Sequence, residues 1–270
     1  MSERPDLLTR EGAKIDKFAF TLVPEAERAP QLGLITLSTD LTIEQEVWQF
    51  IGHGTRAGKT PNILHSRIHS DDEVTAEKLT AMKDRFGLSL GLMPKAHHFD
   101  VIGYGCTSAS LLIGENEIIN VVKSHSDTAH VTTPLTAARH AMASVGARKI
   151  AYLAPYISDI SLTMCRYLET KGFEIVAAGT FGEGRDSQVG QIDSVSILTA
   201  ITSLAKNARQ TADAVFVSCT ALNCAPIIAP AETALGIPVI SSNSALAWHM
   251  ARLADITVPA NANGMLFDQN

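Results

Sequence analysis

Two cysteines close two similar segments of the chain, and they are the residues best suited to chemistry in this sequence. Residues 99–108 read FDVIGYGCTS and residues 212–221 read ADAVFVSCTA, so that an Asp precedes each Cys by six positions. The match makes Cys106 and Cys219 equivalent positions of an internal repeat. A duplicated α/β fold places such positions at a shared cleft.

The place of each thiol within its segment indicates its chemistry. Each Cys follows an apolar, strand-like run and precedes Thr and small residues, so we expect both thiols where a strand ends and a helix begins. Unpaired N–H groups at a helix N-terminus favour negative charge, lower the pKa of a thiol and bind carboxylates. Two thiols facing one carbon can remove a proton from one side and return it from the other, or one thiol can add to a double bond.

The alternative for each thiol taken alone is that it is a small buried apolar residue, as cysteines often are. Cys165 and Cys224 have no counterpart in the other half of the chain, and we interpret both as structural. The repeat, and not either Cys by itself, supports the catalytic interpretation.

Other sites of familiar chemistry are not predicted. Residues 52–60 (GHGTRAGKT) resemble a phosphate-binding loop, but they carry His53 where that motif requires Gly, and they follow a helix instead of a strand. His65 and His69 lie in a strand-like run, where four positions span about 13 Å, too far for one ion. The sequence therefore predicts no nucleotide site, no metal site and no cofactor.

Composition narrows the class of protein. The chain has 270 residues, 46% of them hydrophobic, and a net charge of −6; it can bury a large core and offers no basic surface for nucleic acid or an anionic membrane. No apolar run approaches the roughly 20 residues of a membrane span, and residues 1–16 lack the apolar core of a secretion signal. We expect a cytoplasmic enzyme with free thiols, a small-molecule carboxylate as substrate, and a homo-oligomer, either a dimer or a tetramer.

Short apolar runs alternate with amphipathic stretches, which is typical of parallel sheets covered by helices, so the fold class is α/β. Strands are expected over residues 32–37, 62–68, 101–105, 149–153, 173–178, 214–218 and 238–240. Helices are expected over residues 42–51, 158–171 and 244–253. Glu44 and Glu46 suit the positive N-terminal end of the first helix.

The repeat also predicts the domain organisation. Residues 1–31 form an arm, residues 32–133 a first flavodoxin-like lobe and residues 134–240 a second, pseudo-symmetric lobe. The last segment, residues 241–270, packs back on the first lobe. The two lobes enclose the cleft that holds both cysteines.

Several motifs resemble one known superfamily. They are the two Cys segments, APYI at residues 154–157, GIPVISSN at residues 236–243 and GMLFD at residues 264–268. Together they resemble the aspartate/glutamate racemase superfamily, and within it the maleate isomerase and arylmalonate decarboxylase branch. The resemblance covers most of the chain, from about Leu32 to Asp268.

The resemblance implies a cofactor-independent enzyme with one catalytic Cys on each of two lobes. Arylmalonate decarboxylases keep only the second Cys, so the presence of the first favours isomerase or racemase chemistry. The site residues that the resemblance implies are catalytic Cys106 and Cys219, carboxylate-binding Thr107, Ser108 and Thr220, and Tyr156 at the pocket wall.

Two positions depart from the maleate isomerase pattern. Asp40 and Asp186 stand where those enzymes carry Asn, and a carboxylate repels the substrate carboxylate that an amide would bind. The change favours a substrate with a cationic group, which we expect these two residues to hold, over maleate. The alternatives are that Asp40 caps the first helix and that Asp186 lies in a solvated loop.

These two Asp residues, the turn after Cys106 and the stretch LAWHM at residues 246–250 look most like the ectoine-utilisation proteins of the superfamily. Ectoine is a small zwitterion with a cationic ring and a carboxylate, as the charge pattern requires. We expect an isomerase or racemase that acts on such a carboxylate in ectoine or hydroxyectoine breakdown. The alternatives are a maleate cis–trans isomerase, an arylmalonate-type decarboxylase and a non-catalytic small-molecule binder.

Overall fold

The chain folds around two sheets of four strands each. The computed structural model describes residues 15–24, 27–208, 210–259 and 264–268. The strands are β1 (Gln31–Leu37), β2 (Asn62–Ile68), β3 (Phe99–Gly105) and β4 (Thr128–Thr132) in the first sheet, and β5 (Lys149–Ala154), β6 (Glu174–Thr180), β7 (Ala214–Val217) and β8 (Val239–Ser241) in the second.

Helices cover both sheets. They are α1 (Ile43–Ile51), α2 (Ala76–Ala81), α3 (Phe86–Leu90), α4 (Thr107–Ile113), α5 (Glu115–His125), α6 (Pro134–Ser144), α7 (Ser158–Thr170), α8 (Asp186–Val189), α9 (Ser194–Lys206), α10 (Ala225–Leu235) and α11 (Ser242–Leu253). Short 3-10 helices lie at η3 (Met82–Arg85) and η4 (Met265–Asp268). Among the described helices, none has the length and apolar character needed to cross a membrane.

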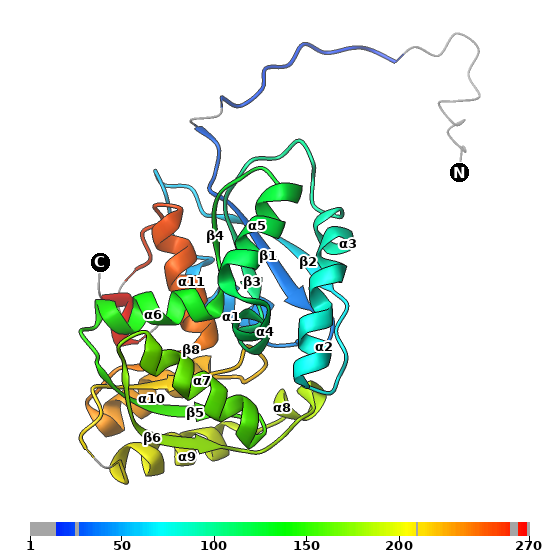
Figure 1. Ribbon diagram of the computed structural model, residues 1–270. Helices are drawn as coiled ribbons and strands as arrows, with labels where there is room; N and C mark the ends of the chain where they lie inside the picture. The colour runs from blue at the N-terminus through cyan, green and yellow to red at the C-terminus, as the bar shows by residue number, and fades with distance from the viewer. Residues whose placement is uncertain (1–14, 25–26, 209, 260–263, 269–270) are drawn as a thin grey trace, which may run out of the picture.

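The two sheets share one topology. Their strand orders are β2-β1-β3-β4 and β6-β5-β7-β8, and all neighbouring strands are parallel. Strands β3 and β7, which precede the two repeated cysteines, therefore hold the same place in each sheet. Figure 1 shows the sheets in two lobes, one above the other. The predicted α/β fold with two similar lobes is confirmed.

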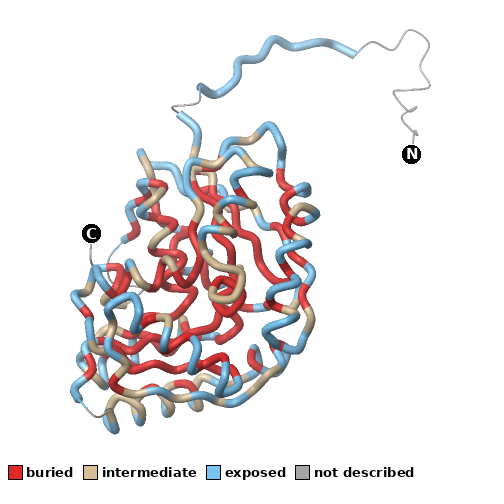
Figure 2. Tube along the Cα trace, viewed as in Figure 1, coloured by how far each residue is buried: buried red, intermediate tan, exposed pale blue. Residues whose placement is uncertain are grey.

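The central strands form because their residues are apolar on both faces, as parallel sheets with helices on both sides require. All four residues of β7 and nearly all of β1 and β3 are buried, and Figure 2 shows this buried band running through both lobes. The seven predicted strands are present within two residues of their expected ends. The prediction missed β4, an edge strand with the sequence TAHVT, which has one buried residue and no apolar run.

The predicted helices are present, with starts set by side chains. Helix α1 starts at Ile43 because Asp40 Oδ1 accepts hydrogen bonds from the N–H groups of Thr42 and Ile43, at 2.8 and 3.0 Å. Helix α11 starts at Ser242, two residues before the expected start, because the hydroxyl of Ser241 accepts from Ser244 N–H in a capping box.

Helix α11 joins the two halves of the molecule. It packs against α6, α1 and β3, and it follows β8 of the second sheet directly. Helix α6 in turn contacts α4, β3 and β8. Residues at the start of α11 therefore lie against both lobes.

Close packing surrounds the end of β3. A Cβ atom on Gly105 would lie 2.4 Å from Ile43 Cδ1 and 3.3 Å from the carbonyl oxygen of Ile35. Gly105 immediately precedes Cys106, so the contact brings α1 and β1 against the strand that carries the first thiol.

We predict that Gly105→Ala destabilises the protein. The added methyl group overpacks the contact with Ile43, and we expect the free energy of unfolding to fall by about 1–3 kcal/mol in urea denaturation. Gly190→Ala is the matched control, because its Cβ would meet no atom closer than 3.8 Å and its φ of −63° suits alanine. Equal stabilities of the two variants would contradict the prediction.

Candidate active site

The first thiol ends β3 and caps the helix that follows it. Cys106 Sγ accepts a hydrogen bond from Ala109 N–H at 3.4 Å and lies 3.6 Å from the hydroxyl of Ser108. Cys106 is the N-cap of α4, as the sequence predicts. Its side chain is almost completely buried.

The second thiol occupies a different local structure. Cys219 has a φ of +132°, in the region that favours glycine, and α10 starts only at Ala225. The prediction that this thiol lies at the start of a helix is therefore wrong. The polar contacts of the loop explain its shape, because Cys219 N–H donates to Ser242 Oγ at 3.0 Å and Ala221 O accepts from Thr42 Oγ1 at 2.9 Å.

One hydroxyl links the two cysteine segments. Ser242 Oγ accepts from Cys219 N–H and also from Thr107 Oγ1, at 2.8 Å. Thr220 Oγ1 adds a longer contact to Gly105 O at 3.4 Å. The residues that follow β3 and the residues that follow β7 are thus joined directly, through the first residue of α11.

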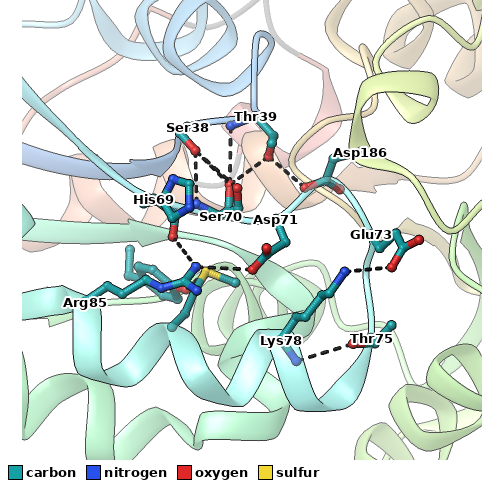
Figure 3. A network of polar contacts seen from close by, with 12 residues as sticks. Ser38, Thr39, His69, Ser70, Asp71, Glu73, Thr75, Lys78, Arg85 and Asp186 are labelled. Carbon is teal, nitrogen blue, oxygen red and sulfur yellow. Dashed lines mark hydrogen bonds and ion pairs between the residues drawn. The ribbon is translucent and has the colours of Figure 1, made fainter.

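The two predicted acids are both buried beside the thiols. Asp40 is 1% exposed; one oxygen caps α1, whereas Oδ2 lacks a hydrogen-bond partner among the described residues. Asp186 is 8% exposed and its Oδ2 accepts from Thr39 Oγ1 at 3.0 Å. Figure 3 shows Asp186 pointing at Thr39, whose hydroxyl also meets that of Ser70. Asp40 therefore does cap the helix, and the alternative that Asp186 lies in a solvated loop is wrong.

Burial sets the ionisation of these groups. It raises the pKa of Asp40 and raises that of Asp186 to about 6. Burial also raises the pKa of Cys106 to about 12 and that of Cys219 well above its usual range. The negative charges of Asp186 and Asp40 raise both thiol pKa values further. The expectation that helix N-termini lower the thiol pKa values is wrong here, because burial between the lobes outweighs the local N–H contacts.

The remaining predicted site residues lie around the thiols in different ways. Tyr156 is buried; burial raises its pKa well above the usual range, and the charges of both thiols raise it further. The hydroxyl of Thr107 is directed to Ser242, and the hydroxyl of Ser108 lies against Cys106. Thr107 is therefore engaged in holding the second cysteine loop.

Sequence reasoning missed the residues that support the Cys219 loop. Glu46 is 2% exposed, and its two oxygens accept from Ala225 N–H at 2.6 Å and Asn243 Nδ2 at 2.8 Å. Asn243 Nδ2 also donates to Thr220 O at 2.8 Å. Glu46 lies in the first turn of α1, as the sequence predicts, but its carboxylate binds residues at the start of α10 and in α11. The signals for Ser242 and Asn243 were their position directly after a strand and their place in the motif GIPVISSN.

The site is closed to solvent. The two thiols are 3% and 5% exposed. Beside Asp186 the two lobes are also joined by backbone hydrogen bonds, since Val74 N–H donates to Gly184 O at 2.8 Å and Asp186 N–H to Asp72 O at 2.9 Å.

Known proteins share this arrangement of sheets. A model of the arylmalonate decarboxylase family matches residues 95–267, which include both cysteines. A maleate isomerase of Nocardia farcinica is 23% identical over 248 residues, covering 89% of this chain and 96% of the relative. The arylmalonate decarboxylase of Bordetella bronchiseptica is 25% identical over 156 residues, 57% of this chain and 65% of the relative.

A solved structure supports the same relationship at the level of the fold. A mutant of the Nocardia farcinica maleate cis-trans isomerase with a covalently bound succinylcysteine intermediate aligns with a TM-score of 0.79 at 23% identity. The alignment covers 89% of this chain and 99% of that one. The two-lobe architecture is therefore common to both proteins.

We predict that Glu46 gives the stability of the protein a pH dependence. Burial raises its pKa from 4.5 to about 7, so between these values the folded state binds more protons than the unfolded state, and stability falls as pH rises. The loss amounts to about 3 kcal/mol by pH 8. Urea unfolding between about pH 5 and pH 8 should show that Glu46→Gln lacks this component.

The matched control for this prediction is Glu44→Gln. Glu44 lies on the same helix, is partly exposed and pairs with Arg67 at 2.9 Å. We expect this variant to keep the pH dependence of the wild type. The same pH dependence in wild type and Glu46→Gln would show that the buried carboxylate does not titrate as described.

Proposed function

The chain belongs to the arylmalonate decarboxylase family, and on this premise we propose that it is a cofactor-independent isomerase or racemase of a small carboxylate. The observation that carries the proposal is that the segments holding two buried thiols, Cys106 and Cys219, follow equivalent strands and are joined through one serine. A reducing compartment such as the cytoplasm is part of the proposal, because the four cysteines are unpaired.

The two thiols divide the work of moving one proton. One cysteine, as thiolate, takes the proton from the substrate carbon, and the electron pair of the broken C–H bond stays on that carbon beside the carboxylate. The other cysteine returns its proton to the opposite face of the same carbon, so the two residues exchange protonation states. For an unsaturated substrate, one thiolate instead forms a C–S bond to one carbon of the double bond, and the other thiol gives its proton to the neighbouring carbon. The C–C bond, now single, rotates; the second thiolate then takes the proton back, and the C–S bond breaks as the double bond forms again.

The hydroxyl groups near the thiols can bind the substrate carboxylate. The oxygen of Ser242 already accepts two hydrogen bonds, so its own proton remains to be donated. We propose that Ser242 binds the carboxylate together with Ser108 and Thr220. Thr107 contributes by holding Ser242 in place.

The buried carboxylates can bind a cationic group of the substrate. Asp40 Oδ2 has no hydrogen-bond partner among the described residues. The negative charge of Asp40 raises the pKa of Asp186, which burial already raises, and both carboxylates raise the pKa values of the two buried thiols. A substrate cation placed between them satisfies that oxygen and offsets the charge that raises the thiol pKa values. Binding of a zwitterion thus favours formation of the thiolate it needs.

This charge pattern favours a zwitterion over a dianion. The relatives named above are a maleate isomerase and an arylmalonate decarboxylase, and a diacid would meet two buried carboxylates here. We therefore propose a zwitterionic substrate from ectoine or hydroxyectoine breakdown, a link that rests on the sequence resemblance. Maleate isomerisation or decarboxylation of a diacid is the second candidate, favoured by those relatives.

We predict that both cysteines are needed for exchange at the substrate carbon. Proton NMR in deuterated water should show deuterium entering a stereocentre of an ectoine-related zwitterion with the wild-type protein. Cys106→Ser and Cys219→Ser should each lower the rate at least about 1000-fold while binding persists in calorimetry, because serine is a far weaker acid than cysteine. Cys165→Ser is the matched control and should keep the rate.

Substantial exchange in both active-site serine variants would contradict the two-thiol mechanism. Tight binding with no exchange in the wild type would instead identify a non-catalytic binding protein. Turnover of maleate, with none of the zwitterions, would favour the second candidate.

We predict that Asp40→Asn shifts the substrate preference toward maleate. Asparagine keeps the oxygen that caps α1 and replaces the unpaired oxygen by an N–H₂ group that can donate to a carboxylate. The ratio of kcat/KM for maleate to that for the zwitterion should rise about 10- to 100-fold, which corresponds to the free energy of one hydrogen bond to a charged group. Asp72→Asn, at the contact between the lobes, should leave the ratio unchanged, and an unchanged ratio in Asp40→Asn would count against the cation site.

A further inference from the structure

The N-terminal arm presents large apolar side chains to solvent. Ile15, Phe18, Phe20 and Leu22 are 79–86% exposed, and Figure 1 shows this segment running away from the body of the molecule. Within the described chain, residues 15–24 make one backbone hydrogen bond outside the arm, from Glu27 N–H to Pro24 O. Large apolar residues gathered on one exposed segment mark a docking element.

The arm has the pattern of a β-strand without a sheet. Phe18, Phe20 and Leu22 alternate with Lys17, Ala19 and Thr21, so in an extended chain the first three side chains lie on one face. Aromatic residues and Thr favour strands. The arm therefore carries both requirements of an added strand, an apolar face and a row of unpaired backbone groups.

Edge strand β2 offers matching backbone groups. Asn62 N–H donates to Pro30 O, and Ile68 O accepts from Ser38 N–H, so these residues direct their backbone groups toward β1. In a parallel strand the direction alternates, so Ile63, His65 and Arg67 direct their N–H and C=O groups to the open edge of the described sheet. Such an edge pairs readily with another chain.

An exposed pair of leucines belongs to the helical segment that packs against β2. Leu88 and Leu92 are 81% and 79% exposed and lie four residues apart, on and just after α3. Helix α3 packs on β2, where Ser66 Oγ donates to Ser89 O at 2.7 Å. The apolar face of an added strand would cover both leucines.

We propose that residues 15–24 bind a second copy of this chain, adding as a strand along β2 and covering Leu88 and Leu92. The exchange is reciprocal, so that each copy gives its arm and receives that of its partner, which closes the assembly as a dimer. The direction of the arm, away from its own body, suits a partner better than its own edge.

The buried area suits a stable dimer. Two exchanged arms bring four phenylalanine rings into the interface, at roughly 150–250 Å² each, and the surfaces that receive them lose a similar area. The total is comparable to the about 1,600 Å² of a standard stable interface. The proposal is independent of the chemistry at the two thiols.

Analytical ultracentrifugation of the full-length protein tests the proposal. The wild type should sediment with about twice the mass of one 28.9 kDa chain. Phe20→Asp places a charge on the apolar face of the arm, and His65→Pro removes one outward N–H of β2 without touching the bonds to β1. Each should raise the dissociation constant of the dimer about 30-fold or more.

Thr21→Asp is the matched control, because it adds the same charge next to Phe20 on the other face of the arm. It should dimerise as the wild type does, and circular dichroism should show all variants folded. A monomeric wild type, or a dimer that survives either Phe20→Asp or His65→Pro, overturns the proposal.

Discussion

The hydroxyl of Ser242 is the contact on which the geometry of the site depends. Its oxygen accepts one hydrogen bond from the hydroxyl of Thr107 in the first lobe and another from the N–H of Cys219 in the second. Because both bonds end on one oxygen, the residues after β3 and after β7 cannot move independently. The strained backbone at Cys219, with its φ of +132°, is held by this bond and by the contacts of the following residues with α1. Two strand ends from two sheets thus become one site.

The electrostatics of that site follow from its closure. Two carboxylates and two thiols lie together with almost no exposure to water, and burial raises the pKa of all four groups. A cation placed beside these groups lowers their pKa values, and the carboxylates that ionise as a result pair with it. A zwitterion brings that cation and places its carboxylate near the hydroxyls. Its positive charge then offsets the negative charges of Asp40 and Asp186.

The features of the fold and the site that could be predicted from the sequence are those that local residue patterns determine. Buried parallel strands are continuous apolar runs, and the repeat around Cys106 and Cys219 identified equivalent strand ends. The edge strand β4 has no such run and was missed. The role of Ser242 and the burial of Glu46 depend on contacts between residues more than 100 positions apart, which no local pattern records. The local effect of a helix N-terminus was outweighed by burial between lobes.

The most direct test of the two-thiol site is a crystal structure with a small, unreactive zwitterionic carboxylate bound. We predict that Cys106 Sγ and Cys219 Sγ both lie within about 4 Å of one ligand carbon, on opposite faces. The cationic group should lie against Asp40 and Asp186, and the carboxylate against Ser242. A ligand that contacts one sulfur only, or that binds away from both, would contradict the account.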